Sequence, residues 1–213
     1  MRRARVLLAD DHRIVAEGLK GILEPEFELV GIVEDGRALV EAVEKLQPDV
    51  VVADISMPLL NGIEAMRQFK KKYKDVAVVF LTMHTDLMYA ADAFEAGASG
   101  YVLKHSASSE LVAAVSSAFM GRTYITPLLA GKLLEFHKQK SQGPSEESTG
   151  LTGRQREVLQ LLAEGHSVNE IASILGISSK TVEFHKYSMM ENLGLKTSAD
   201  LVRYAVKHGI VDE

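Results

Sequence analysis

The sequence predicts two domains, a doubly wound (βα)₅ domain of the α/β class followed by an all-α domain of four helices. In the first part of the chain, short runs rich in Val and Leu alternate with segments of helical length, which is typical of buried parallel strands and their crossover helices. In the last part, apolar residues recur only at helical spacing. The predicted boundaries are 1–124 for the first domain, 125–150 for a linker and 151–213 for the second domain.

Five apolar runs are the predicted strands of the first domain: residues 6–9, 29–33, 50–53, 78–81 and 100–103. Apolar stripes at helical spacing lie between or after them: Ile14, Leu19, Ile22 and Leu23; Leu39, Val43 and Leu46; Ile63, Met66 and Phe69; Leu111, Val112, Val115 and Phe119. Because crossovers between parallel strands are right-handed, these helices are expected to cover both faces of one sheet.

The linker changes character along its length. Residues 127–136 are amphipathic and predict a helix. The stretch that follows, residues 137–150, contains almost nothing to bury, so it predicts a flexible tether.

Helix-capping residues divide the second domain. Thr152 and Gln155 form a predicted capping box, and Gly165 ends that first helix. Further helices are predicted over residues 168–175, from 180 to about 192 and over 198–208. The middle pair is joined through residues 176–178 as in a helix-turn-helix, whose second helix enters the DNA major groove. A plain helical bundle is the alternative for such a four-helix pattern.

Polar side chains follow four of the predicted strands. Asp10 and Asp11 follow the first, Asp54 the third, Thr82 the fourth and Lys104 the fifth. Ligands of open α/β sheets bind outside the carboxyl ends of the strands, so these side chains are expected to converge. Three carboxylates, a hydroxyl and an ammonium suit a hard cation and a phosphoryl group, with one carboxylate as nucleophile. Each residue alone is more commonly a turn or surface residue, and their joint placement favours the functional interpretation.

Residues 1 to about 124 resemble the receiver domain of bacterial two-component response regulators, which has a flavodoxin-like fold. The resemblance is carried by residues 6–12, 54–58, 61–62, 81–82 and 97–104. Residues 151–211 resemble the LuxR-type helix-turn-helix at 170–172, 176–178 and 180–185. The whole chain therefore resembles a NarL/FixJ-type regulator, which implies the strand order 2-1-3-4-5 and a phosphorylation-dependent transcriptional regulator that is not an enzyme.

The resemblance implies that Asp54 accepts a phosphoryl group from a sensor histidine kinase, with Mg²⁺ as cofactor. Asp11, Asp54 and the backbone carbonyl of Ser56 are the implied direct ligands, and Asp10 is the implied ligand through water. Three crowded carboxylates also need a cation in order to remain ionised together.

Three further residues are implied in catalysis and signalling. Lys104 contributes positive charge to the transferring phosphoryl oxygens. The Thr82 hydroxyl bonds a phosphoryl oxygen and vacates space that the ring of Tyr101 can enter, and this switch controls dimerisation and DNA binding. Ordinary strand packing is the alternative for Tyr101. Ser56 and His84 are expected to border the position of the hydrolytic water, and their size and chemistry favour slow loss of the phosphoryl group.

The third helix of the second domain carries the residues expected to contact double-stranded DNA: Lys180, Thr181, Glu183, Phe184, His185, Lys186 and Tyr187. Thr181, His185 and the lysines suit phosphate contacts, whereas the remaining three occupy positions that resemble the base-reading ones of the family. Residues 151–213 hold seven Lys and Arg against eight Asp and Glu. A monomer is therefore expected to bind weakly, and a homodimer on two half-sites to bind well.

In LuxR-type domains the last helix is the usual pairing surface, which implies Leu201, Val202, Ala205 and Val206 here. The alternative is that these residues fill the core.

Composition narrows the class of protein. There is no Cys, and no apolar run approaches the length of a membrane span, so a cytoplasmic protein without membrane contact is expected. No GxxxxGK[ST] segment is present, which excludes an ATPase-type activator.

Two alternative functions remain: a phosphorylation-independent dimeric DNA-binding regulator, and an aspartyl-phosphate hydrolase. The hydrolase is disfavoured because Ser56 stands where such an enzyme has a second acid.

Overall fold

The computed structural model describes residues 2–83, 87–140 and 150–211 of the 213-residue chain. The N-terminal domain alternates strands and helices in chain order: β1 (Arg5–Ala9), α1 (Arg13–Leu23), β2 (Glu28–Val33), α2 (Gly36–Leu46), β3 (Val50–Ala53), α3 (Gly62–Phe69), β4 (Ala77–Thr82), α4 (Leu87–Glu95), β5 (Gly100–Leu103), the 3₁₀ turn η1 (Lys104–Ser106), α5 (Ala107–Phe119) and β6 (Tyr124–Ile125). All neighbouring strands are parallel, and their order is β2-β1-β3-β4-β5-β6. The doubly wound α/β fold is confirmed.

Both faces of the sheet are covered by helices, which explains the continuous apolar character of the strands. On β1, Leu7 and Ala9 point into a core shared with α2, α3 and α4, whereas Val6 and Leu8 point into a core shared with α1 and α5. Two helices on the first face begin at side-chain caps: Asp35 accepts hydrogen bonds from two amides of α2, and Asn61 from one amide of α3.

The (βα)₅ pattern implied a fourth helix without locating it, strand β6 was not predicted, and two stripe residues, Ile14 and Phe119, are exposed. Strand β6 and helix α4 had no separate periodic signal, because β6 has two residues and α4 is apolar over most of its length. Ile14 was expected in the buried stripe of α1 but is 91% exposed. Ile14 lies five positions before Leu19, which turns it about 140° away from the buried face, and Ala16 takes its place there.

Helix α6 (Pro127–Lys140) confirms the predicted linker helix and packs against α4 through Leu129 and Leu133. The tether predicted at residues 137–150 falls largely outside the described residues.

The C-terminal domain consists of α7 (Gly153–Ala163), α8 (Val168–Leu175), α9 (Ser179–Asn192) and α10 (Ser198–Lys207) around a separate core. The predicted capping box of Thr152 and Gln155 is present, and Gly176 ends α8 in the left-handed conformation. Thr197 and Asp200 form a further capping box at the start of α10. The predicted helix-turn-helix therefore consists of α8 and α9.

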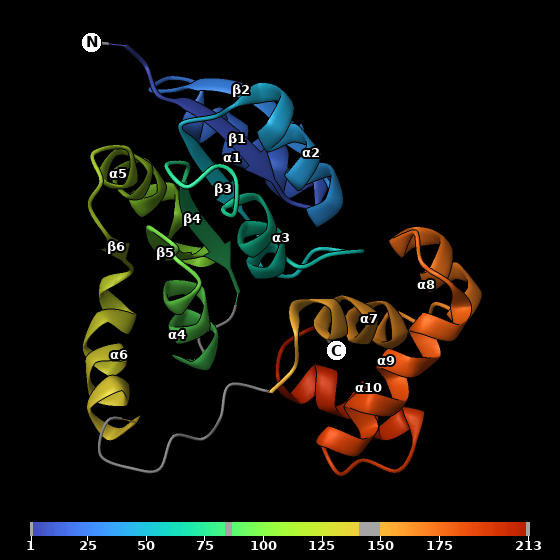
Figure 1. Ribbon diagram of the computed structural model, residues 1–213. Coiled ribbons are helices and arrows are strands. Elements are labelled where there is room, and N and C mark those ends of the chain that lie inside the picture. The colour runs from blue at the N-terminus through green and yellow to red at the C-terminus, as the bar shows by residue number, and fades with distance from the viewer. Residues whose placement is uncertain (1, 84–86, 141–149, 212–213) are drawn as a thin grey trace.

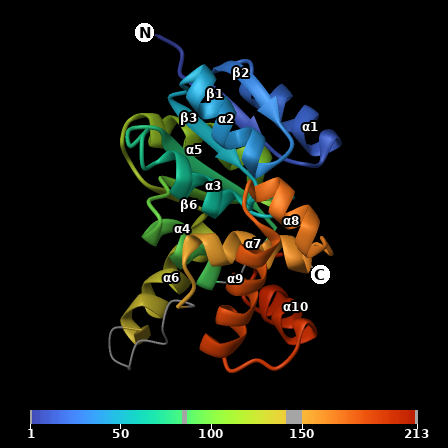
Figure 2. The same cartoon turned by 45° about the vertical axis from the view of Figure 1, so that its right-hand side comes forward.

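The two domains lie against each other, with α7 beside α3 and the loop that follows β3 (Figures 1 and 2). A second contact joins the end of α10 to α4: a Cβ atom built on Gly209 would lie 1.6 Å from the ring of Tyr89. The C-terminal domain is thus docked on the edge of the sheet where the strands end.

Candidate phosphoryl site and DNA-binding helix

The predicted polar residues meet at the carboxyl ends of the central strands. Asp10 and Asp54 are 1% and 6% exposed. The Lys104 ammonium lies 2.8 Å from Asp10 Oδ2 and 2.6 Å from Asp54 Oδ2. One cation that follows β5 therefore joins the carboxylates that follow β1 and β3. Asp11 is partly exposed beside them.

The strand ladder holds these carboxylates in place. The Asp10 amide donates to the Val33 carbonyl at 3.0 Å, and the Asp54 amide donates to the Ala9 carbonyl at 2.8 Å. Gly62 begins α3 directly behind Asp54, where a Cβ atom would lie 2.2 Å from the Asp54 carbonyl oxygen. A larger residue could not begin α3 at this position without moving the backbone of Asp54.

Burial and charge oppose each other at Asp54. Burial raises the pKa of the Asp54 carboxyl above its ordinary value, and the Lys104 ammonium offsets part of that rise. Burial on its own would lower the pKa of Lys104, but Asp54 and Asp10 outweigh it and raise that pKa. The attraction between the two groups therefore favours the ammonium form of Lys104 and opposes the effect of burial on Asp54.

The donor set suits a hard divalent cation. One oxygen each of Asp10, Asp11 and Asp54 and one nitrogen of His12 lie within 4.8 Å of one another. Three carboxylates face one ammonium, which leaves excess negative charge that a cation can balance, and carboxylate oxygens are the ligands that Mg²⁺ prefers. His12 was not predicted in this cluster; its Nδ1 lies 2.9 Å from Asp11 Oδ1.

Thr82 and Tyr101 are both fully buried on neighbouring strands. Thr82 is paired in register with Leu103, and Tyr101 with Phe80. Phe80, Tyr101 and Leu103 all belong to the core under α4, and the Tyr101 ring lies 6.5 Å from that of Phe94 on α4. His84, expected near the hydrolytic water, lies outside the described residues.

The predicted DNA-reading face of α9 remains open while the domains are docked. Phe184 and Tyr187 are 66% and 64% exposed, and Lys180 and Glu183 are exposed as well. Thr181, His185 and Lys186 are half-buried. Val182 and Met189 anchor the opposite side of the helix in the core.

Helix α10 divides its four predicted pairing residues between two environments. Leu201 and Ala205 are fully buried in the core of their own domain. Val202 and Val206 lie on the neighbouring face and are half-buried. Leu201 and Ala205 therefore fill the core, which was the alternative to a pairing role.

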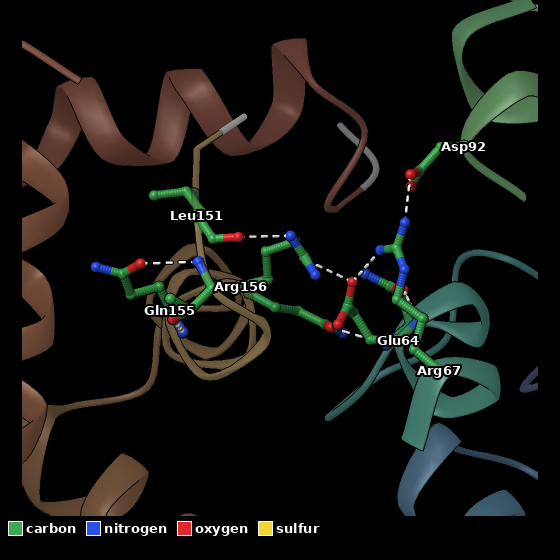
Figure 3. A network of polar contacts seen from close by, with 9 residues as sticks. Glu64, Arg67, Asp92, Leu151, Gln155 and Arg156 are labelled. Atoms are coloured by element: carbon green, nitrogen blue, oxygen red, sulfur yellow. Dashed lines mark hydrogen bonds and ion pairs between the residues drawn. The ribbon is translucent and has the colours of Figure 1, made fainter. Parts of the chain in front are cut away.

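The polar residues that join the domains were not found from the sequence. They are Arg37, Glu64, Arg156, Glu157, Gln160 and Glu164. Figure 3 shows part of this network, in which Arg156 of α7 and Arg67 of α3 both reach Glu64. No local pattern marks these residues, because their partners lie far away along the chain.

Within residues 2–83, 87–140 and 150–211, no helix combines the length and apolar character needed to span a membrane.

Comparisons with known proteins agree with this description. Residues 6–116 match the model of the response regulator receiver domain, and residues 149–205 match that of the bacterial regulatory proteins of the luxR family. The transcriptional regulatory protein DegU of Brevibacillus brevis is 36% identical over 225 residues, covering 98% of this chain and 95% of that protein. The response regulator UvrY of Escherichia coli K12 is 34% identical over 209 residues, covering 96% and 94%.

Solved structures of the response regulator RcsB have the same architecture. One from Salmonella typhimurium matches with a TM-score of 0.67 and 29% identity over 98% of this chain and 99% of that one. Another, bound to promoter P1flhDC in the presence of the phosphomimetic BeF₃⁻, matches with a TM-score of 0.64 and 30% identity, covering 97% and 100%.

The fold and the site define a receiver domain joined to a LuxR-type helix-turn-helix domain. The chain belongs to the NarL/FixJ family of two-component response regulators, and it is a transcriptional regulator with a DNA-binding domain.

Proposed function

We propose that phosphorylation of Asp54 by a sensor histidine kinase in the cytoplasm switches this regulator into a dimer that binds double-stranded DNA. One observation carries the proposal: the buried Asp54 carboxylate lies beside Asp10 and contacts Lys104, where the strands end. A carboxylate nucleophile with an adjacent ammonium is the arrangement that phosphoryl transfer needs.

In the proposed transfer, an Asp54 oxygen attacks the phosphorus of a phosphohistidine. The new O–P bond forms as the P–N bond breaks, and the imidazole leaves with the electron pair. Lys104 is close enough to stabilise charge on the transferring oxygens. Asp10, Asp11, Asp54 and the Ser56 carbonyl would hold Mg²⁺, which when bound neutralises charge on the phosphoryl group.

We further propose that Thr82 and Tyr101 transmit the change to α4. Tyr101 belongs to the core under this helix, and its ring lies 6.5 Å from that of Phe94 of α4. The same helix carries Tyr89, whose ring lies against Gly209 of the DNA-binding domain, and Asp92, which pairs with Arg67 of α3. A shift at the phosphoryl group could therefore reach the docking surface through one helix.

For DNA, we propose that the exposed face of α9 enters the major groove, with Val202 and Val206 of α10 in the dimer contact. RcsB is described in dimers bound to DNA, which supports this assembly for a chain of the same architecture. Dimerisation also offsets the low positive charge of the domain, because two half-sites double the number of phosphate contacts.

The rival function, DNA binding that ignores phosphate, is favoured by one observation: Phe184 and Tyr187 are exposed even though the domains are docked.

The proposed transfer of a phosphoryl group to Asp54 is tested by mass spectrometry after treatment with acetyl phosphate and Mg²⁺. The wild-type chain is expected to gain about 80 Da, the mass of a phosphoryl group, and Asp54→Asn is expected to gain nothing. A full adduct on Asp54→Asn would overturn the assignment.

A further inference from the structure

Residues 55–61 form the loop that follows β3 and Asp54, and side chains of the DNA-binding domain hydrogen-bond to its main chain. Two side chains of the DNA-binding domain contact three of its main-chain polar groups. Gln160 accepts from the Asn61 amide at 2.8 Å and donates to the Met57 carbonyl at 2.9 Å. The Glu164 carboxylate accepts from the Leu59 amide at 3.2 and 3.3 Å and from the Gln160 amide group at 2.7 Å. Gln160 is 1% exposed, so these bonds exchange little with water.

The docked domain contributes to the conformation of this loop. Leu59 has a φ of 65°, in the left-handed region that residues other than Gly rarely adopt. Such a conformation persists where surrounding contacts hold it. Contacts from both domains hold it. Within the loop the Leu60 amide donates to the Pro58 carbonyl at 2.8 Å, while the Leu59 side chain packs against the core of the DNA-binding domain and the Leu59 amide is bonded to Glu164.

The receiver holds the two ends of the same loop. The Ser56 amide donates to Asp54 Oδ1 at 3.3 Å, and the Gly62 amide donates to the Ile55 carbonyl at 2.8 Å. The peptide that follows Ser56 therefore lies between a bond to the phosphoacceptor and the bond from Gln160 to Met57. A change at either end must pass through this short segment.

We infer that Gln160 is a positioning residue of the phosphoryl site, supplied by the DNA-binding domain and acting through the main chain of residues 56–61. The inference rests on the proposed function in one respect: phosphorylation must favour release of the DNA-binding domain. Coupling between two equilibria is reciprocal, so a domain released by phosphorylation must oppose phosphorylation while it is docked. Gln160 makes the most buried of these contacts, so it is the residue through which this opposition acts.

The test uses the full chain and follows phosphorylation by acetyl phosphate over a range of Mg²⁺ concentrations. Gln160→Ala removes the contacts with Met57 and Asn61 and is expected to lower the Mg²⁺ concentration at which half of the chain is phosphorylated by on the order of fivefold or more. Gln160→Glu keeps the shape of the side chain but places a carboxylate oxygen against the Met57 carbonyl, where no hydrogen bond can form. Its phosphorylation is therefore expected to change in the same direction as that of Gln160→Ala. Gln160→Glu also serves if the alanine variant folds poorly.

Gln155→Ala is the matched control, since Gln155 is also buried on α7 but bonds Thr152 and Ser188 within its own domain. It is expected to phosphorylate like the wild type. The inference is wrong if Gln160→Ala needs as much Mg²⁺ for phosphorylation as the wild type, or if Gln155→Ala changes by the same factor. A wild-type chain that forms no adduct would instead refute the proposed function.

Amide hydrogen exchange gives a second test. It distinguishes a local release of this loop from a general loss of stability, which would expose amides throughout the domain. The amides of Leu59 and Asn61 have their partners on Glu164 and Gln160, so both are expected to exchange faster after phosphorylation and in Gln160→Ala. The Asp54 amide, bonded to Ala9 within the sheet, is expected to stay protected in both cases. Unchanged exchange at Asn61 in Gln160→Ala would contradict the inference.

Discussion

Arg156 of the DNA-binding domain forms an ion pair with Glu64 of the receiver, and the Glu64 side chain is only 4% exposed (Figure 3). Glu64 also pairs with Arg67, which reaches Asp92 on α4. The contacts therefore run from α7 through α3 to the helix that packs over Tyr101. Because a buried carboxylate is costly without its partners, this network favours the docked arrangement.

Arg156→Glu is expected to separate the two domains, because it places a second carboxylate against buried Glu64. Loss of the charged hydrogen bond alone should weaken docking by about 2 kcal/mol, or roughly 30-fold. Small-angle X-ray scattering of the unphosphorylated chain should show a larger radius of gyration. Lys196→Glu makes the same change of charge at an exposed position of the same domain and is expected to leave the radius unchanged. Equal radii for Arg156→Glu and the wild type would show that this pair does not hold the domains.

Lys104→Ala is expected to slow phosphorylation of Asp54 by on the order of 100-fold, since it removes one preorganised cation from the transferring group. The DNA response to phosphodonor should weaken with it. The rate of adduct formation is measured by mass spectrometry, with exposed Lys45→Ala as control. If Lys104→Ala reacts at the wild-type rate, Lys104 only pairs with Asp10 and Asp54 in the unphosphorylated protein and does not assist the transfer.

Val202→Glu is expected to keep the phosphorylated chain monomeric and to weaken binding to a two-half-site operator, without unfolding the domain. The companion variant Leu201→Ala removes a fully buried side chain and should instead cost about 3 kcal/mol of unfolding free energy. Sedimentation and gel-shift assays read the first effect, and thermal unfolding reads the second. A dimeric Val202→Glu that binds normally would place the interface elsewhere, whereas an unfolded one would assign Val202 to the core.

Acid should weaken the start of α10 at an unusually low pH. Hydrogen bonds from Thr197 and Arg203 lower the pKa of Asp200 to about 2. A lowered carboxyl pKa adds stability that is fully present above the ordinary pKa, near 4, and is lost as the pH falls through the folded value near 2. The difference in unfolding free energy between the wild type and Asp200→Asn should thus be constant above about pH 5 and shrink toward pH 2. A difference that does not change between pH 5 and pH 2 would contradict this role.

The convergence of these polar side chains could be predicted because parallel strands bring their carboxyl ends together whatever the loops do. Asp10, Asp54 and Lys104 meet for that reason, although 50 residues separate the last two. The capping box at Thr152 was equally accessible, since both of its members lie within one helical turn.

The sequence alone does not predict which surfaces of the two domains and of the helices contact each other. Gln160 lies in an apolar segment of α7, and only the docked loop explains why an amide is buried there. Leu201 and Val202 are both apolar, so their division between core and surface depends on how α10 is rotated. Helix α4 is apolar over most of its length, which leaves no periodic signal to locate it.

The central claim is that phosphorylation of Asp54 raises DNA affinity. An operator is first obtained by binding-site selection, and its affinity for the full chain is then measured with and without acetyl phosphate and Mg²⁺, for the wild type and for Asp54→Asn. We predict that phosphodonor tightens binding of the wild type by about tenfold or more and does not change binding of Asp54→Asn. Equal wild-type affinity with and without phosphodonor, in samples in which mass spectrometry shows the adduct, would contradict the account and favour a phosphorylation-independent regulator.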